Sequence, residues 1–205
     1  MELIICEDED HFVRAISVWC KTQIQQLNAR SVFIPAGKTP ECIYRFWEKS
    51  KPDYLNNLEL LQVDDVLTGD SQFLFRRFLE SSLPSYERKF RWINDGSYIG
   101  DLAILGLGLN GHVAFHEPGL NQSLFSGCVK LNAETCHSLG ISDGSWGITY
   151  GLAAFNRSKG VLLIVRGAPK RQVLSRLLKG DHALPASQLL KHPNLTIIAD
   201  RDAYG

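Results

Sequence analysis

The stretch Asp101–Gly119, DLAILGLGLNGHVAFHEPG, carries an apolar run that leads into a glycine-rich turn. The run at 102–105 is typical of a central parallel strand that helices cover on both faces. Gly106, Gly108 and Gly111 allow backbone conformations and close approaches that larger side chains prevent. In α/β proteins, the carboxyl end of such a strand is where ligands bind. The stretch therefore predicts an α/β fold with a site at the end of this strand.

Four polar side chains follow this strand closely: Asn110, His112, His116 and Glu117. The glycines also satisfy the dinucleotide-binding pattern G-x-G-x-x-G, and Glu134 lies about as far downstream as a ribose-binding acid should. That pattern should open a long helix, whereas Pro118 and Gly119 interrupt the chain soon after the third glycine. The sequence therefore disfavours NAD binding.

Apolar runs alternate with amphipathic helical patterns along the rest of the chain. We expect strands at residues 31–35, 58–63, 101–107, 161–166 and 195–199. We expect helices at residues 11–28, 39–49, 71–79 and 169–178. This alternation predicts a mainly parallel sheet with helices on both faces. Residues 81–100 have turn residues and no long period, so we expect a surface connection in which Trp92 serves the core or an interface.

The composition is that of a globular enzyme, and 205 residues are enough for one α/β domain over residues 1–205. Lys plus Arg and Asp plus Glu both number 22, so the zero net charge favours neither a nucleic-acid partner nor an anionic membrane. The N-terminal residues lack a basic region followed by an apolar core, and no apolar run reaches membrane-spanning length. These features predict a cytoplasmic location.

The cysteines are odd in number and lack the C-x-x-C spacing; they are Cys6, Cys20, Cys42, Cys128 and Cys136. This pattern argues against a disulfide scaffold and against a zinc ribbon. We therefore expect reduced and mostly buried thiols.

Residues 36–40, AGKTP, join an expected strand to an expected helix. Backbone amides in a glycine turn at a helix start point toward an anion, and the helix dipole adds to the attraction. Lys38 adds a positive charge, Thr39 adds a hydroxyl, and Pro40 suits the first helical turn. The spacing is not that of a P-loop, and an ordinary strand-to-helix turn with a solvated lysine is the alternative. We predict that this loop, with Gly37, binds phosphate.

Asp64 and Asp65 end the apolar strand expected at 58–63. A partly desolvated carboxylate at the carboxyl edge of a sheet has the basicity that proton abstraction requires. Aspartate also stabilises turns after strands, so a structural role is the alternative. The residues alone favour the structural role.

Five sequence blocks together resemble one known enzyme family. Residues 106–119, GLGLNGHVAFHEPG, resemble the G-x-G-x-D-G-H-[IV]-A-F-N-E-P signature of the glucosamine-6-phosphate deaminase family, whose fold group includes the 6-phosphogluconolactonases. Residues 34–40, IPAGKTP, resemble its L-P-[TS]-G-x-T-P loop, and residues 61–65, LQVDD, resemble its strand ending in an Asp-Glu pair. Residues 167–170, GAPK, and 187–193, SQLLKHP, resemble its Gly-x-x-Lys turn and its S-x-L-Q-x-H-P block. The blocks follow the family's order and span nearly the whole chain.

The resemblance implies a Rossmann-like three-layer α/β/α fold with a mainly parallel sheet. It also implies a deaminating aldose–ketose isomerisation of an amino-sugar phosphate, in which glucosamine 6-phosphate becomes fructose 6-phosphate and ammonia. The partner is then a small phosphorylated amino sugar, and the reaction uses no metal and no nucleotide cofactor. We expect a monomer or a small homo-oligomer.

The resemblance also implies roles for individual residues. Asp64 matches the base that moves a proton between C2 and C1, and His112 matches the residue that opens the sugar ring. Glu117 matches the carboxylate that supports this imidazole, and Lys170 matches a phosphate-binding lysine. The other positions of the substrate and phosphate site are Gly37, Lys38, Thr39, Asp65, Gly108 and Gly111.

The chain departs from the family's pattern at three places. Asn110 stands where the family has aspartate beside the histidine, and asparagine forms hydrogen bonds without carrying a negative charge. We therefore hypothesise a slow or altered-specificity deaminase in which restoring that charge would raise turnover. His116 stands where asparagine is common, and we interpret it as a loop residue rather than a second catalyst. Residues 131–150 contain no arginine, although the family uses a substrate-contacting arginine there.

Two other functions stay open. Hydrolysis of 6-phosphogluconolactone would use the same phosphate loop and histidine, but the Phe-His-Glu-Pro sequence at 115–118 favours the deaminase. A noncatalytic sugar-phosphate sensor would keep the phosphate loop and lose the proton-transfer geometry, and Asn110 is its support in the sequence.

Overall fold

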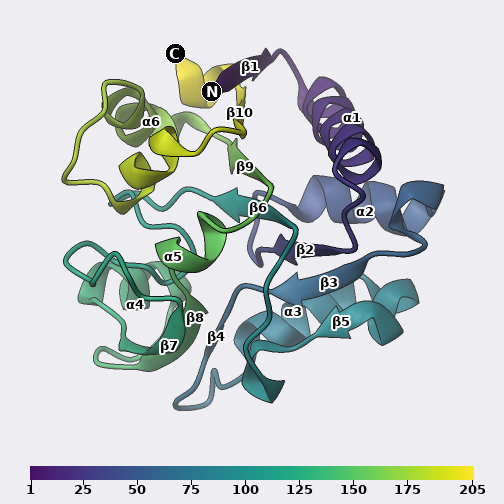
Figure 1. Cartoon of the computed structure of the whole chain (residues 1–205). Coiled ribbons are helices and arrows are strands. Elements are labelled where there is room, and N and C mark those ends of the chain that lie inside the picture. The colour runs from purple at the N-terminus through teal and green to yellow at the C-terminus, as the bar shows by residue number, and fades with distance from the viewer.

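The computed structural model describes residues 1–205 and contains a seven-stranded parallel sheet (Figure 1). The strands lie in the order β1 (Glu2–Cys6), β10 (Leu195–Asp200), β9 (Gly160–Val165), β6 (Leu102–Gly106), β2 (Ser31–Ile34), β3 (Glu59–Gln62) and β5 (Phe90–Arg91). Every neighbouring pair in this sheet is parallel. The predicted α/β class with a mainly parallel sheet is confirmed.

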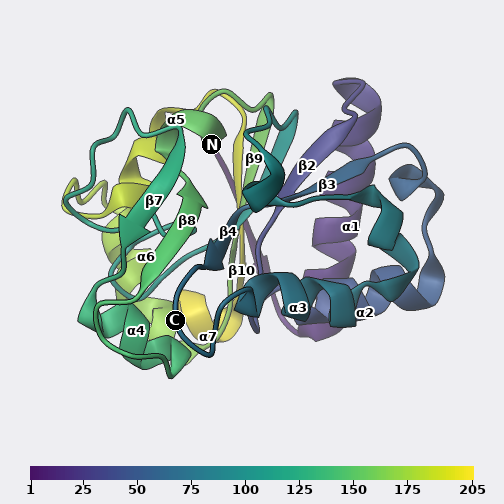
Figure 2. The same cartoon turned by 90° about the horizontal axis from the view of Figure 1, so that it is seen from below.

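Helices cover both faces of this sheet, so the molecule has three layers (Figure 2). One face packs against α1 (Glu9–Gln26), α2 (Glu41–Ser50) and α3 (Leu74–Ser82) around a cluster of 25 buried residues. The other face packs against α5 (Leu152–Phe155), α6 (Arg171–Leu178), α7 (Arg201–Tyr204) and the 3-10 helix η5 (Pro185–Lys191) around a second cluster of 25. The central strand β6 therefore has buried apolar side chains on both faces, as the unbroken apolar run at 102–105 predicts.

The strand order reverses direction between β2 and β6. From β2 the chain proceeds outward to β3 and β5, whereas β6 is followed on its other side by β9 and β10. In open α/β sheets, the loops at such a switch point diverge and leave a crevice at the carboxyl ends of the strands. The glycine-rich turn after β6 and the loop after β2 both begin at this crevice.

A second, three-stranded antiparallel sheet lies beside the first and was not predicted. It consists of β4 (Asp64–Val66), β8 (Trp146–Tyr150) and β7 (Ser126–Lys130), and β4 begins two residues after β3 ends. Helix α4 (Ala133–Leu139) follows β7. A small separate core joins this sheet to α4 through Val66, Phe115, Val129, Leu131 and Cys136.

The structure corrects the predicted elements at three places. Strand β1 was not predicted, although it forms one edge of the main sheet. Helix α3 begins at Leu74, because Phe73 before it adopts the left-handed conformation with φ of 60°. The segment 81–100 is not merely a surface connection, since it contains β5 and buries Tyr86, Phe90, Trp92 and Ile93.

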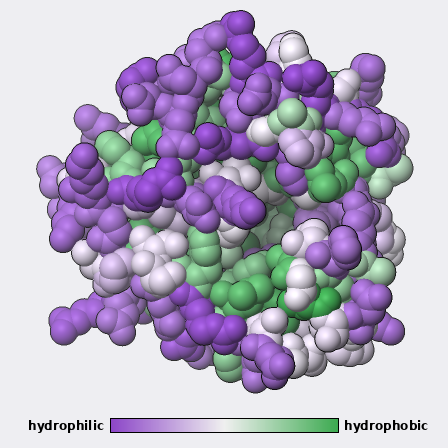
Figure 3. Space-filling model, turned by 180° about the vertical axis from the view of Figure 1, so that it is seen from behind, coloured by the Kyte–Doolittle hydropathy of each residue, from purple (hydrophilic) through white to green (hydrophobic).

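The predictions for Trp92 and for the thiols are confirmed. Trp92 belongs to a core cluster, and the guanidinium carbon of Arg76 lies 4.6 Å from the centroid of its ring. All five cysteines are free thiols, and every one except Cys128 is buried. No helix combines the length and the apolar character that crossing a bilayer requires. On the face seen in Figure 3, hydrophilic residues form most of the rim and apolar residues surround a central hollow.

Asp65 ties the start of α3 to the small sheet. Its Oδ1 accepts hydrogen bonds from the backbone N–H groups of Val66 and Phe75, each at 2.9 Å. Its Oδ2 accepts from the backbone N–H of Arg76 at 3.2 Å and from Gln62 Nε2 at 2.9 Å. Burial raises the pKa of the Asp65 carboxyl, and these hydrogen bonds oppose part of that rise. The residue is fully buried, so the predicted substrate contact of Asp65 is replaced by a structural one.

We expect Asp65→Ala to lower the free energy of unfolding by about 2–4 kcal/mol, because it leaves one buried and two part-buried backbone donors without this acceptor. Asp65→Asn keeps one acceptor oxygen and should lose less. The matched control is Asp70→Ala in the neighbouring loop, where the side chain is exposed. Denaturant unfolding followed by circular dichroism measures the difference, and equal stability of the two alanine variants would contradict the assigned role.

Candidate active site

Two adjoining pockets form a cleft at the switch point of the main sheet. Both are lined by His112, Thr135 and Ser138. The first pocket also reaches Asp64, and the second also reaches Lys170. His112 therefore lies between a carboxylate and an ammonium group, which come from segments far apart in the sequence.

Asp64 is buried at the start of β4, with 5% of its surface exposed. No side chain or backbone group of the protein hydrogen-bonds to its carboxylate, although the residue lines the pocket. Burial, together with the negative charge of Asp65, raises the pKa of Asp64 well above its ordinary value. The cleft thus contains a carboxylate that is more basic than an exposed aspartate and has no competing partner.

His112 follows the glycine turn after β6 and contacts Glu117. The His112 Nδ1 lies 3.3 Å from Glu117 Oε2, and its backbone N–H donates to Asn110 Oδ1 at 3.1 Å. Because an ionised carboxylate only accepts hydrogen bonds, this contact assigns the ring proton of neutral His112 to Nδ1. The lone pair on Nε2 is then free to accept a proton.

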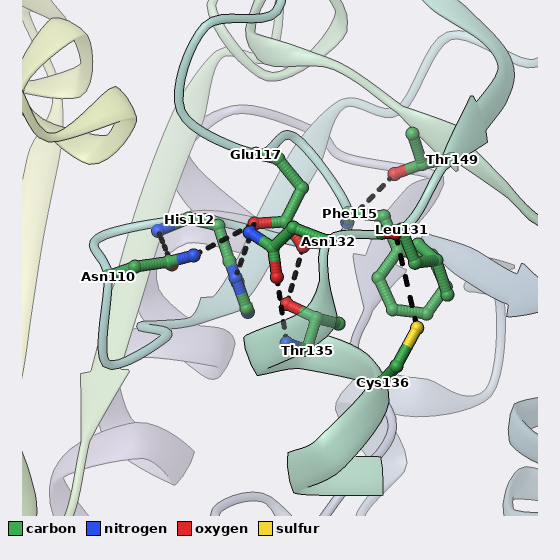
Figure 4. A network of polar contacts seen from close by, with 9 residues as sticks. All are labelled: Asn110, His112, Phe115, Glu117, Leu131, Asn132, Thr135, Cys136 and Thr149. Atoms are coloured by element: carbon green, nitrogen blue, oxygen red, sulfur yellow. Dashed lines mark hydrogen bonds and ion pairs between the residues drawn. The ribbon is translucent and has the colours of Figure 1, made fainter. Parts of the chain in front are cut away.

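Glu117 is buried, and four side chains donate hydrogen bonds to its carboxylate (Figure 4). The donors are Asn110 Nδ2 at 2.9 Å, His112 Nδ1 at 3.3 Å, Asn132 Nδ2 at 2.8 Å and Thr135 Oγ1. Burial by itself would raise the pKa of Glu117, but the hydrogen bond and charge of His112, with the bonds from Thr135 and Asn110, lower it. The site therefore holds Glu117 ionised beside the imidazole.

Asn110 forms hydrogen bonds that the hypothesis of a lost negative charge did not consider. Its amide uses both ends, because Nδ2 donates to Glu117 while Oδ1 accepts from the backbone of His112. An aspartate at this position would bring a second carboxylate to a distance at which Asn110 now donates a hydrogen bond. The asparagine is thus complementary to Glu117, a role that comparison with the family signature did not suggest.

Lys170 ends the 3-10 helix η4 (Ala168–Lys170) after β9 and lines the second pocket. Its ammonium forms no ion pair within the protein. Burial lowers the pKa of Lys170, and the negative charge of Glu134, which lines the same pocket, opposes that shift. A half-buried cation without an ion-pair partner is suited to hold an anionic group of a ligand.

The loop after β2 divides between two pockets. Pro35 and Ala36 line the pocket of Asp64. Lys38 and Thr39 instead line a separate polar pocket together with Arg166, Gly167, Asp200 and Asp202. The structure therefore does not bring the side chains of Lys38 and Thr39 into the pocket of Lys170. Gly37, between Ala36 and Lys38, has φ of 100°, a conformation that favours glycine.

His116 lies outside the cleft. It is 1% exposed, and its Nδ1 accepts a hydrogen bond from the backbone N–H of Leu152 at 3.3 Å. Burial lowers the pKa of His116, which keeps the ring neutral and able to accept that bond. Its contact with the start of α5 is structural, in agreement with the prediction that it is not a second catalyst.

Sequence reasoning missed Thr135 and Ser138, which α4 brings to the cleft, and Asn132 before the helix, which donates a hydrogen bond to Glu117. The prediction for residues 131–150 considered only the absence of arginine. The available signal was the spacing Asn132-x-x-Thr135, which is typical of a helix N-cap. The structure confirms this cap, because Asn132 Oδ1 accepts from the backbone N–H of Thr135 at 2.8 Å.

Two glycines leave room that the turn around His112 requires. A Cβ atom added at Gly108 would lie 2.4 Å from Cδ2 and Nε2 of the His112 ring. Gly111 has φ of 84°, and a Cβ atom there would lie 2.7 Å from Leu184. Gly108 therefore determines where the imidazole lies, and Gly111 determines how the turn packs on the core.

A family model described as glucosamine-6-phosphate isomerases/6-phosphogluconolactonase matches residues 76–198 of the chain. A glucosamine-6-phosphate deaminase of Bacillus cereus (strain G9842) is 37% identical over 111 residues, which are 50% of this chain and 42% of that protein. The chain thus matches less than half the length of this relative. A glucosamine-6-phosphate deaminase of Shouchella clausii (strain KSM-K16) is 28% identical over 216 residues, which are 88% of this chain and 87% of that protein.

Solved structures share the fold over almost the whole chain. The structure of a monomeric glucosamine-6-phosphate deaminase has a TM-score of 0.83 at 21% identity and covers 99% of this chain and 98% of its own. A 6-phosphogluconolactonase from Thermotoga maritima has a TM-score of 0.74 at 22% identity, covering 97% of this chain and 98% of its own. At these identities the likeness establishes the three-layer fold.

We expect Gly108→Ala to displace the His112 ring, because the added methyl group would overlap it. The variant should lose about 1–3 kcal/mol of stability, as overpacked sites do. The ring nitrogens of His112, observed by ¹⁵N NMR, should shift away from the Nδ1-protonated pattern. Gly127→Ala on β7 is the control, since its added Cβ atom would meet only Leu124 at 3.5 Å. An unchanged His112 spectrum in Gly108→Ala would refute this account of the glycine.

Proposed function

The chain belongs to the family of glucosamine-6-phosphate isomerases and 6-phosphogluconolactonases, and we propose that it deaminates and isomerises an amino-sugar phosphate. The best-supported reaction converts glucosamine 6-phosphate and water to fructose 6-phosphate and ammonia. The observation that carries this proposal is that Asp64, without a hydrogen-bond partner in the protein, shares a cleft with the His112–Glu117 pair. Asp64 moves a proton between carbons, and His112 moves protons between oxygens.

Ring opening is the proposed task of His112. Its Nε2 lone pair accepts the proton of the anomeric hydroxyl, and the imidazolium then returns a proton to the ring oxygen as the C1–O5 bond breaks. The products are an open-chain aldehyde and the neutral imidazole. The ionised Glu117 stabilises the imidazolium that forms between the two transfers, because it accepts a hydrogen bond from Nδ1.

Isomerisation is the proposed task of Asp64. The carboxylate removes the C2 proton of the open-chain sugar, which gives an enolamine, and then delivers a proton to C1. The bond between C2 and nitrogen becomes an imine, which water hydrolyses to the ketone and ammonia. The raised pKa of Asp64 suits both halves of this transfer, since a carboxylate of ordinary pKa is a weaker base toward carbon.

Phosphate binding is the proposed task of Lys170, supported by the backbone of the loop after β2. Lys170 offers a cation in the second pocket, at the other side of His112 from Asp64. Gly37 and the adjoining amides of the loop begin at the same crevice. We propose Lys38 and Thr39 as an outer part of this site, because their side chains line the neighbouring polar pocket.

The lactone reaction is the second candidate, and His112 is the residue that would support it. An imidazole with a free Nε2 and an ionised partner can direct water at a lactone carbonyl as readily as it can open a sugar ring. The lactonase would have no need for a basic Asp64, whose burial without a partner lowers stability. That difference favours the deaminase.

We expect ammonia release from glucosamine 6-phosphate, measured with a coupled glutamate dehydrogenase assay. His112→Ala should lower kcat by roughly 10²–10⁴-fold, the usual loss on removing a general acid–base group. Galactosamine 6-phosphate and 6-phosphogluconolactone are the comparison substrates. Lactone hydrolysis without ammonia from either amino sugar would replace the proposed reaction, and sugar-phosphate binding without any turnover would identify a sensor.

We expect Asp64→Asn to lower kcat by roughly 10²–10⁴-fold and to raise the stability at pH 7 by about 1–2 kcal/mol. The folded pKa of Asp64 lies above the unfolded one, so the ionised group lowers stability increasingly as pH rises above the ordinary aspartate range. The gain in the variant should therefore vanish near pH 3, where both states of the parent are protonated. Thermal unfolding from pH 3 to pH 8 measures it, with exposed Asp70→Asn as the control. A variant no more stable than the parent at pH 7 would contradict the proposed cost of the buried charge.

A further inference from the structure

We propose that Asn132 and Thr135 are positioning residues that hold Glu117, and through it His112, in the geometry that proton transfer requires. This inference rests on the proposed function and extends it to α4, which the catalytic scheme above does not use. Neither residue is the base, the ring-opening group or the phosphate ligand of that scheme. Their hydrogen bonds join α4 to the loop that carries His112 (Figure 4).

The two oxygens of Glu117 have different partners. Asn110, His112 and Asn132 all donate to Oε2. Thr135 Oγ1 is the one donor to Oε1. The Thr135 hydroxyl therefore determines how the carboxylate is rotated about its own bond, and that rotation aims Oε2 at the His112 ring.

Asn132 joins two functions in one side chain. Its Oδ1 caps α4 by accepting from the backbone N–H of Thr135 at 2.8 Å. Its Nδ2 donates to Glu117 Oε2 at 2.8 Å. The start of α4 is therefore attached directly to the carboxylate, and any displacement of the helix would move Glu117 as well.

The hydrogen bond between Thr135 and Glu117 is buried, and the one between Asn132 and Glu117 is part-buried. Thr135 is 3% exposed and Glu117 is 4% exposed. Hydrogen bonds to a charged group in such surroundings are stronger than exposed ones, and losing one donor leaves the carboxylate with incomplete solvation.

The side of α4 that carries Thr135 also faces the cleft, since Thr135 lines both of its pockets. Glu134 and Ser138 are exposed and line the pocket that also contains His112 and Lys170. The same short helix thus borders the proposed substrate pocket and donates a hydrogen bond to Glu117. The orientation of His112 consequently depends on a helix that borders the substrate.

The test compares four variants of the full chain. Thr135→Val keeps the shape of the side chain and removes the donor, whereas Thr135→Ser keeps the donor. Asn132→Ser keeps an N-cap oxygen and removes the amide donor to Glu117. Thr196→Val on β10 is the matched control, because Thr196 is a buried threonine whose hydroxyl donates to another carboxylate, Glu2, at 3.3 Å.

We expect Thr135→Val and Asn132→Ser to lower kcat about 10–100-fold, with KM changed less than about threefold, as loss of an outer hydrogen-bond partner commonly does. Thr135→Ser should restore kcat to within a few-fold of the parent, and Thr196→Val should lose stability without losing kcat. In ¹⁵N NMR without substrate, the ring nitrogens of His112 should leave the Nδ1-protonated pattern only in Thr135→Val and Asn132→Ser.

An unchanged His112 pattern in both of these variants would overturn the positioning role, as would a loss of kcat in Thr135→Ser equal to that in Thr135→Val. The spectra need no substrate, so they decide the role even if the parent releases no ammonia. In that event the proposed function alone fails. If Thr135→Val does not fold, Asn132→Ser carries the test, because it retains the cap of α4.

Discussion

The arrangement of the site depends on a buried carboxylate that cannot remain buried without donors. Glu117 is 4% exposed, and an isolated charge at that depth would be strongly destabilising. Four side chains from the catalytic loop and from α4 with its cap supply hydrogen bonds instead. Meeting this one requirement brings Asn110, His112, Asn132 and Thr135 together. The solvation of Glu117 is thus also what orients the imidazole.

Asp64, which lines the same pocket as His112, is the opposite case. It is as deeply buried as Glu117, yet no protein group hydrogen-bonds to it. Its neighbour Asp65 is surrounded by four donors and anchors α3. The two adjacent aspartates therefore have different surroundings. Asp65 is turned toward the amides at the start of α3, and Asp64 is turned toward the cleft. A group left without partners costs stability, and such costs are characteristic of residues retained for chemistry.

The two sheets contribute different parts of the cleft. The parallel sheet provides the crevice at its switch point, where the turns after β2 and β6 begin. The small antiparallel sheet carries Asp64 on β4 and leads through β7 into α4. The proposed base, Asp64, and the helix that contacts Glu117 consequently belong to the same small sheet and its following helix, and they approach His112 from outside the main sheet.

The sequence by itself determined the parallel sheet, most of its strands and helices, and the stretch that contains His112 and Glu117. Continuous apolar runs and glycine turns are local patterns that report burial and chain reversal wherever the chain goes. Only the tertiary structure decided the small sheet, the different fates of Asp64 and Asp65, the separation of Lys38 from Lys170, and the part played by Asn132 and Thr135. Strand β4 has three residues and pairs with β8, which is distant from it in the sequence, so no local period marks it. The identity of a polar residue likewise does not predict which distant group it will contact, because its hydrogen-bond partners depend on how the elements pack.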